Sequence, residues 1–294
     1  MKKTFDVSNS GEINLVYAFD KVYFHHAINS IKSFFQFYRG NHCITVYFLI
    51  DGYISYLEKI YVEMYIKRLK LICVNNTLDL LTIKNYYYTR STYTRFFLNE
   101  LLPHLHSAIY IDPDTLFIRS FTLKIFDKFI DSGKPIGVVP RDDQKEISRL
   151  LELGMNSDIN FNAGFIFFNF CAEKIRKNQM IEFMSSKSER ILFADQDALN
   201  VIYADADRFY ISEEVTNEYY NYIPIHNNDI SEANEQIKLI HFAGHQKPWW
   251  KVGYSPSNII YWSIVRKISF ISLFVYITLR FKRMILNTYR YVLD

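Results

Sequence analysis

Two apolar runs of the sequence, residues 13–19 and 44–50, each end at an aspartate, Asp20 and Asp51. Unbroken apolar runs of this length are typical of parallel strands that are buried on both faces of a sheet. Segments with helical spacing follow at residues 22–37 and 54–69, and a third apolar run occupies 69–74. This alternation predicts an α/β fold with a Rossmann-like, mostly parallel sheet and helices on both faces.

The same alternation continues along the chain. Residues 92–102 are predicted to form a helix, which Pro103 stops, and residues 107–111 a strand that runs into Asp112-Pro113-Asp114. Further strands are predicted at 135–139 and 164–168, and a helix is predicted to begin near Asp195. Open sheets of this kind bind ligands beyond the carboxyl ends of their strands, so the acids that end the runs are the first candidates for chemistry.

Composition and charge narrow the class of protein. The formal net charge of +3 and the lack of a basic run interleaved with stacking aromatics argue against a nucleic-acid partner. Three cysteines stand far apart in apolar segments without a C-x-x-C pair, which predicts buried thiols in a reducing compartment. The N-terminus lacks the apolar core of a signal peptide, so we expect a cytoplasmic protein.

Asp112 and Asp114 form a D-x-D pattern after a strand. Side chains two residues apart on an extended chain face the same way, and paired carboxylates suit Mg²⁺ or Mn²⁺ bound to a diphosphate. The chain contains no glycine-rich phosphate loop, so a bound nucleotide phosphate must be neutralised by a metal or by side chains. The alternative is a turn in which both aspartates only cap backbone amides.

Four more segments carry polar groups suited to the same ligand. Arg95 follows Tyr93-Thr94 on the predicted helix, and Asn162 lies in the segment Phe-Asn-Ala-Gly before an apolar strand. Asp195-Gln196-Asp197 begins a helix, where carboxylates are favourable. The segment from His241 to Trp249 (HFAGHQKPW) combines an imidazole, a glycine and a lysine.

In this order the motifs resemble those of glycosyltransferase family 8, the retaining UDP-hexose transferases that include bacterial lipopolysaccharide galactosyl- and glucosyltransferases. The resemblance runs from about residue 13 to 250 and implies a GT-A fold. It implies uridine contacts from Ala18, Asp20 and Tyr23, and an arginine near the donor sugar and phosphates at Arg95. The remaining implied roles are metal ligation by Asp112, Asp114 and His241, diphosphate contacts from Gly244 and Lys247, and donor-sugar contacts from Asn162, Asp195 and Gln196.

The resemblance also implies a reaction and a metal. An imidazole beside two carboxylates favours Mn²⁺ over Mg²⁺. The residue expected beside the anomeric carbon is Gln196, whose amide is a poor nucleophile, so we expect front-face substitution with Asp197 as the alternative nucleophile. The donor is expected to be a UDP-hexose, galactose or glucose, and the acceptor a glycan or glycolipid such as lipopolysaccharide core.

Two rival functions are weaker. A phosphatase or phosphotransferase of the haloacid dehalogenase type also uses a strand followed by D-x-D, but in that class the motif ends the first strand of the domain and a threonine falls two residues after the second aspartate. Here Thr115 is adjacent to Asp114. A non-catalytic sugar-binding protein is expected to have lost some motif members, and the main ones are present.

The C-terminal segment, residues 256–294, is predicted to be a helical appendage to a transferase domain at residues 1–255. It is apolar, aromatic and basic, with six basic residues against the single acid Asp294. Its apolar stretch is shorter than the ~20 residues that span a bilayer. A basic amphipathic helix on the inner face of the cytoplasmic membrane is therefore favoured over a helix that only packs on the domain.

Overall fold

The computed structural model describes residues 11–74, 90–211, 237–243, 247–249, 256–274 and 276–278. A seven-stranded sheet forms its centre, with strand order β3-β2-β1-β4-β7-β6-β8. Only β7 runs antiparallel to its neighbours in this sheet, β4 and β6, so the predicted mostly parallel sheet is confirmed. The strands are β1 (Glu12–Asp20), β2 (Cys43–Asp51), β3 (Leu69–Cys73), β4 (Ser107–Ile111), β6 (Ile136–Arg141), β7 (Asn160–Asn169) and β8 (Arg208–Tyr210).

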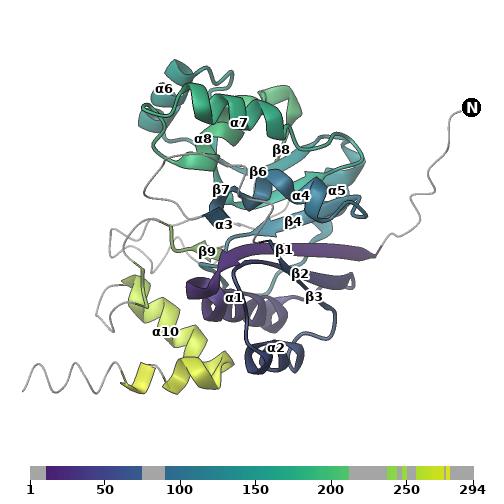
Figure 1. The fold of residues 1–294 in the computed structure, drawn as a ribbon, viewed down its shortest axis with the longest axis vertical. Coiled ribbons are helices and arrows are strands. Elements are labelled where there is room, and N and C mark those ends of the chain that lie inside the picture. The colour runs from purple at the N-terminus through teal and green to yellow at the C-terminus, as the bar shows by residue number, and fades with distance from the viewer. Residues whose placement is uncertain are drawn as a thin grey trace, which may run out of the picture.

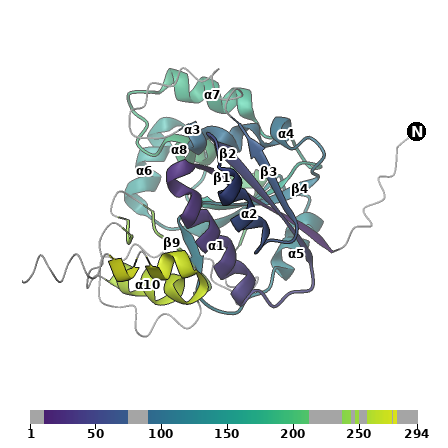
Figure 2. The ribbon, with the colours of Figure 1, turned by 60° about the horizontal axis from the view of Figure 1, so that its bottom comes forward.

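Helices cover both faces of this sheet (Figures 1 and 2). One face packs against α1 (Phe24–Phe37), α2 (Tyr56–Glu63) and α5 (Lys124–Asp131) through a core that contains Phe34, Val62 and Phe129. The other face packs against α3 (Arg90–Tyr93), α4 (Leu98–Leu101), α6 (Gln144–Leu153), α7 (Lys177–Ser186) and α8 (Ala194–Ile202). Because the central strands are apolar on both faces, each face needs its own helical cover.

A second, two-stranded sheet lies beside the first. It pairs β5 (Thr115–Phe117) with β9 (Leu239–His241) in antiparallel register, Thr115 opposite His241. The helix α10 (Pro256–Ile268) packs on it, and Tyr261, Trp262 and Val265 form a third core with Leu116 and Ile240. This small sheet joins the C-terminal part of the chain to the centre of the molecule, together with hydrogen bonds from Tyr261 to His26 and Asn29 of α1.

The structure differs from the sequence predictions in three places. The helix expected at 54–69 is shorter, and the one expected at 92–102 is broken by a 3₁₀ turn, η2 (Thr94–Phe97). The prediction of buried thiols is wrong: Cys43, Cys73 and Cys171 are all exposed and unbridged. Cys43 and Cys73 are terminal residues of β2 and β3, so the apolar neighbours that suggested burial belong to strand interiors that the cysteines do not share.

The C-terminal helices are present as predicted. Within the residues that the structure describes, no helix has the length and apolar character needed to cross a membrane. The division of the chain after residue 255 stays a prediction.

Candidate active site

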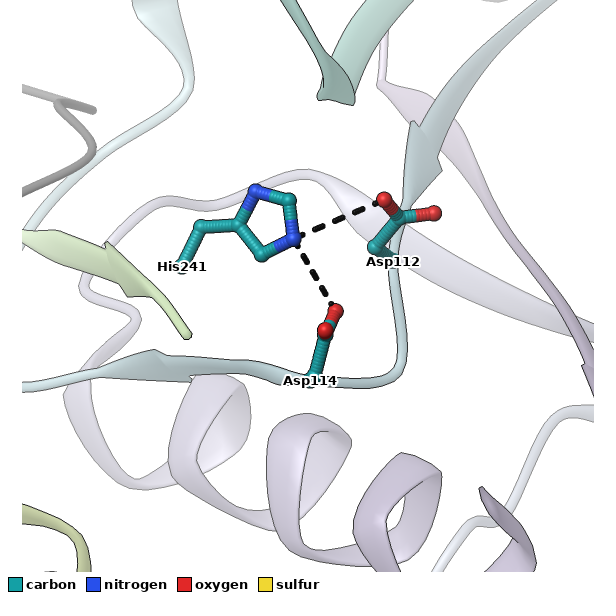
Figure 3. A group of neighbouring side chains, drawn as sticks. All are labelled: Asp112, Asp114 and His241. Carbon is teal, nitrogen blue, oxygen red and sulfur yellow. Dashed lines mark ion pairs between the residues drawn. The ribbon is translucent and has the colours of Figure 1, made fainter. Parts of the chain in front are cut away.

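His241 meets Asp112 and Asp114 at the carboxyl end of β4 (Figure 3). Its Nε2 lies 3.0 Å from Asp114 Oδ1 and 3.6 Å from Asp112 Oδ2. One ligand atom from each residue falls within 4.8 Å of the other two. The pairing of β5 with β9 produces this approach, because it sets His241 beside the strand that directly follows Asp114.

Asn162 orients the imidazole of His241. Its Oδ1 accepts a hydrogen bond from the backbone N–H of Gly164 and lies 2.8 Å from His241 Nδ1. Since this oxygen only accepts, Nδ1 carries a proton, and Nε2 is the ring nitrogen that faces the two carboxylates. A hydrogen bond of this kind fixes the tautomer and ring orientation that a metal-binding histidine needs.

Gly164 makes room for this contact. A Cβ built at this position would collide with the His241 ring and lie 3.0 Å from Asn162 Oδ1. Only a residue without a side chain therefore lets β7 pass so close to the imidazole.

Asp114 also pairs with Lys247, whose Nζ lies 2.6 Å from Asp114 Oδ2 and donates to the carbonyl of Phe242. Burial by itself would raise the pKa of Asp114, but the neighbouring charges of His241 and Lys247 outweigh it and hold the pKa well below its usual range. The carboxylate is therefore ionised and ready to bind a cation.

Arg95 is buried and joins two acids of the site. Its Nη2 donates to Asp112 Oδ1 at 2.9 Å, and its Nε lies 2.7 Å from Asp195 Oδ2. The ring of Tyr110 lies under the guanidinium at 4.3 Å, and the Tyr110 hydroxyl donates to the same oxygen of Asp112. The arginine predicted to reach a diphosphate is thus already engaged by Asp112 and Asp195, and it orients both.

Asp195 is a buried acid with an unusual protonation equilibrium. The Nε–H of Arg95 is directed to the carbonyl of Thr92, so its contact with Asp195 Oδ2 is electrostatic, and that oxygen has no hydrogen-bond partner. Burial raises the pKa of Asp195 to about 7, partly opposed by the charge of Arg95.

Gln196 is linked to the same network through Asn162. Its Oε1 accepts from Asn162 Nδ2 at 2.9 Å and from the Ala163 backbone N–H at 3.3 Å. Gln196 is half-buried, whereas its neighbours Asp195 and Asp197 are fully buried. A continuous chain of hydrogen bonds therefore runs from His241 through Asn162 to Gln196.

The third member of this motif, Asp197, has a different environment. Both of its oxygens pair with the guanidinium of Arg149, at 2.6 and 2.9 Å. The backbone N–H groups of Leu192 and Phe193 also donate to it. These four hydrogen bonds, three to Oδ2 and one to Oδ1, let the carboxylate hold the start of α8 in place, next to the left-handed residue Ala194 (φ 43°).

The residues implied for uridine lie at the end of β1. Asp20 accepts from the backbone N–H groups of Val22 and Tyr23 and so begins the turn η1 (Lys21–Tyr23), while Ala18 is buried in the strand. Burial, and then the nearby carboxylates of Asp114, Asp20 and Asp112, raise the pKa of the Tyr23 hydroxyl. The ring of Tyr23 also meets Trp249 edge to face, two residues after Lys247, which pairs with Asp114.

Comparison with known proteins identifies the group to which this arrangement belongs. Residues 14–253 match the family described as Glycosyl transferase family 8. The chain belongs to glycosyltransferase family 8. This excludes the haloacid dehalogenase alternative, because the family match spans most of the chain, including the D-x-D.

Relatives of this family 8 protein include a lipopolysaccharide 1,3-galactosyltransferase of Salmonella typhimurium, 27% identical over 177 residues. That match covers 58% of this chain and spans about half, 52%, of the relative. Among solved structures, a complex of the galactosyltransferase LgtC with donor and acceptor sugar analogues is similar with a TM-score of 0.69 at 18% identity, over 86% of this chain and 95% of that one. An active-site glutamine-to-glutamate mutant of LgtC is similar with a TM-score of 0.63 at 19% identity, over 81% and 89%. These similarities establish the GT-A fold of the family 8 chain.

Most of the site residues implied by the sequence lie together in this family 8 structure, but Gly244 falls outside the described residues. Three contributors were missed: Arg149, Tyr110 and the steric role of Gly164. Gly164 could have indicated this role, because a glycine inside an apolar strand often marks a place where another group approaches the backbone closely. No sequence pattern links Arg149 to Asp197, because the pair joins two separate helices.

Proposed function

We propose that this protein is a retaining hexosyltransferase that moves galactose or glucose from a UDP-hexose to a cell-surface glycan acceptor, such as lipopolysaccharide core, in α-linkage. One observation carries the proposal: Asp112, Asp114 and His241 converge, and Asn162 connects them to Gln196. The name of the Salmonella relative supports the acceptor class.

A divalent cation fits the residues present, and we assign Mn²⁺, or Mg²⁺, to Asp112, Asp114 and His241. The fit comes from the donor set, two carboxylates and an imidazole whose Nε2 Asn162 directs toward them. When bound, the ion would neutralise the charge that develops on the nucleoside diphosphate leaving group. Lys247, now paired with Asp114, is assigned with Gly244 to the diphosphate.

The donor occupies the remainder of the site in this proposal. Ala18, Asp20 and Tyr23 bind the uridine, and Asn162 and Asp195 lie at the hexose. Gln196 lies at the anomeric carbon; the active site of the structurally similar LgtC also contains a glutamine. Arg95 acts by holding Asp112 and Asp195 in register rather than by reaching the phosphates itself.

Front-face substitution accounts for retention. The bond from the anomeric carbon to the phosphate oxygen breaks, the acceptor oxygen bonds to the same face, and the acceptor proton passes to the leaving phosphate. Asp197 is a poor nucleophile here, because it is fully buried and its negative charge is stabilised by two hydrogen bonds from Arg149 and two from backbone N–H groups. Asp195, the other acid of the motif, is paired with Arg95 and buried.

The test is a screen of UDP-hexoses for metal-stimulated hydrolysis, comparing the wild type with Asp114→Ala. We expect release of UDP by the wild type with Mn²⁺ and a loss of at least about 100-fold in the variant, since a ligand that acts on the leaving-group charge is removed. His42 pairs with Asp127 at 3.1 Å on the surface, so Asp127→Ala is a matched control that should keep its activity.

Two results would contradict the proposal. Activity that persists unchanged in chelator or in Asp114→Ala removes the metal assignment. Tight binding of UDP-hexose without hydrolysis or transfer would instead favour the non-catalytic sugar-binding protein.

We further propose that the protein works on the cytoplasmic face of the inner membrane, bound through its C-terminal segment. The support is the sequence after residue 278, which carries Arg280, Lys282, Arg283 and Arg290 among apolar residues. Clusters of basic residues beside apolar ones favour anionic lipid surfaces by about 1 kcal/mol per basic residue.

A further inference from the structure

The helix α2 exposes apolar side chains where water-facing polar ones are expected. Leu57 and Met64 are 75% and 67% exposed, and Tyr53, Tyr56, Ile60 and Tyr65 are exposed beside them. We call these six residues the α2 face. Single exposed apolar residues are ordinary, but a contiguous group marks an interaction surface.

The C-terminal segment likewise exposes apolar side chains and buries polar ones. Phe270 and Phe274 are 78% and 66% exposed, and Ile277 continues their side of the helical turn. The opposite side is polar and buried: Ser272 donates to Asn29 Oδ1 at 3.0 Å on α1. This segment therefore packs its serines on the domain and presents its phenylalanines outward.

The two apolar surfaces adjoin. Ser269, directly before Phe270, has its Oγ 3.4 Å from the hydroxyl of Tyr61 on α2. Lys32 of α1 contacts the same part of α2, with its Nζ 3.0 Å from the hydroxyl of Tyr61 and 3.4 Å from the ring centre of Tyr65. Figure 1 shows α2 and the C-terminal helices at the same lower end of the molecule.

Basic residues are frequent in the segments that form this combined surface. Lys59, Lys67, Arg68 and Lys70 lie in or shortly after α2, where Lys59 pairs with Glu63 and Arg68 with Glu12, and Arg266 and Lys267 precede Phe270. Tyrosines and phenylalanines together with cations match the interface of an anionic bilayer, where the rings enter the headgroup layer and the cations meet lipid phosphates. A protein partner would not require these cations.

We infer that the α2 face is a second membrane-docking element, which binds an anionic lipid bilayer together with the C-terminal segment. The inference rests on the proposed membrane association and extends it to a part of the chain far from the tail. Tyr53 follows the end of β2, where Asp51 pairs in register with Asp20, and Lys21 of η1 lies 3.9 Å from Glu58. Docking through α2 therefore places the carboxyl ends of β1 and β2, and with them the proposed donor site, beside the bilayer. An acceptor carried on a lipid then reaches the proposed donor site without leaving the membrane.

The experiment measures binding of the full-length protein to vesicles of phosphatidylglycerol and phosphatidylethanolamine. The variant Leu57→Glu/Met64→Glu places two negative charges on the α2 face and should weaken binding about tenfold or more, because two apolar side chains no longer enter the bilayer and lipid phosphates are repelled. The control Leu151→Glu makes the same kind of change at a residue that is 50% exposed, and should bind as the wild type does. Leu151 lies on α6, at the opposite end of the molecule in Figure 1.

The outcomes separate this inference from the proposals beneath it. Equal vesicle binding by the wild type and Leu57→Glu/Met64→Glu overturns the α2 face as a membrane-docking element. If the wild type forms a dimer that this variant does not form, the α2 face binds a second copy of the chain instead. A wild type that ignores these vesicles overturns both docking elements. UDP-hexose hydrolysis in vesicle-free solution should be the same in wild type and both variants, and its absence in the wild type sinks the catalytic proposal alone.

Discussion

Replacing Gly164 by alanine tests whether Asn162 fixes the orientation of the His241 ring. The new methyl group would collide with the His241 ring and crowd Asn162 Oδ1. The imidazole must rotate away, which breaks its 2.8 Å contact with Asn162 and turns Nε2 from Asp112 and Asp114. No charge or ligand is deleted, so any effect reports on orientation.

The magnitude follows from the hydrogen bond that this rotation breaks and from the crowding that the methyl group causes. Disrupting the hydrogen bond that orients a metal-binding histidine costs about 10–100-fold in metal affinity, which corresponds to about 1.4–2.7 kcal/mol. Crowding a packed site by one methyl group costs about 1–3 kcal/mol of folding free energy. Gly164→Ala should therefore bind Mn²⁺ one to two orders of magnitude more weakly while remaining folded.

The assay is titration calorimetry with Mn²⁺, together with thermal unfolding. Gly137→Ala is the matched control. Gly137 lies on β6, and its new Cβ would lie 3.0 Å from the Cβ of Phe167, which is on β7 like Gly164 but in the apolar core. It should lose similar stability and keep its metal affinity. If Gly164→Ala bound Mn²⁺ as tightly as the wild type, the orienting role of Asn162 would be refuted.

Two further predictions concern the acids of α8. Asp197→Asn keeps an oxygen for the N–H groups of Leu192 and Phe193 and should reduce turnover only about tenfold, whereas loss of a true nucleophile costs about 10⁴-fold or more; a hexose adduct on Asp197 found by mass spectrometry would contradict a positioning role. Because burial raises the pKa of Asp195 to about 7, the unfolded chain releases this proton at lower pH, so the stability that the protonated group contributes is lost as pH rises from about 4 to about 7. In chelator, the free energy of unfolding of the wild type should therefore fall by up to about 4 kcal/mol relative to that of Asp195→Asn between these pH values, as measured by denaturant unfolding. If the free energies of unfolding of the two proteins changed with pH in parallel, the pKa of Asp195 would not be raised in the folded protein.

The fold was largely predictable because buried parallel strands appear in the sequence as continuous apolar runs. The predicted strands at 13–19, 44–50 and 69–74 differ by only a residue or so from β1, β2 and β3, and 107–111 coincides with β4. The three-residue strands β5 and β9 were not predicted, since so few residues carry no periodicity.

The sequence predicted which residues form the site better than it predicted the contacts between them. The motifs implied that Asp112, Asp114 and His241 meet, and they do. Arg95 was expected to be available to phosphate, but its segment folds as a 3₁₀ turn that buries the guanidinium between Asp112 and Asp195. Such engagement depends on which acids the fold brings within reach, and spacing along the chain does not record it.

The third core has a consequence for where the catalytic unit ends. The family match stops at residue 253, yet Tyr261, Trp262 and Val265 cover Leu116 and Ile240. Ile240 immediately precedes His241, so stripping away α10 would uncover the inner side of the strand that delivers the imidazole. The end of the family match thus cuts through a shared core, and a protein trimmed to residues 14–253 should lose the proposed metal site before β1 and β2 are disturbed.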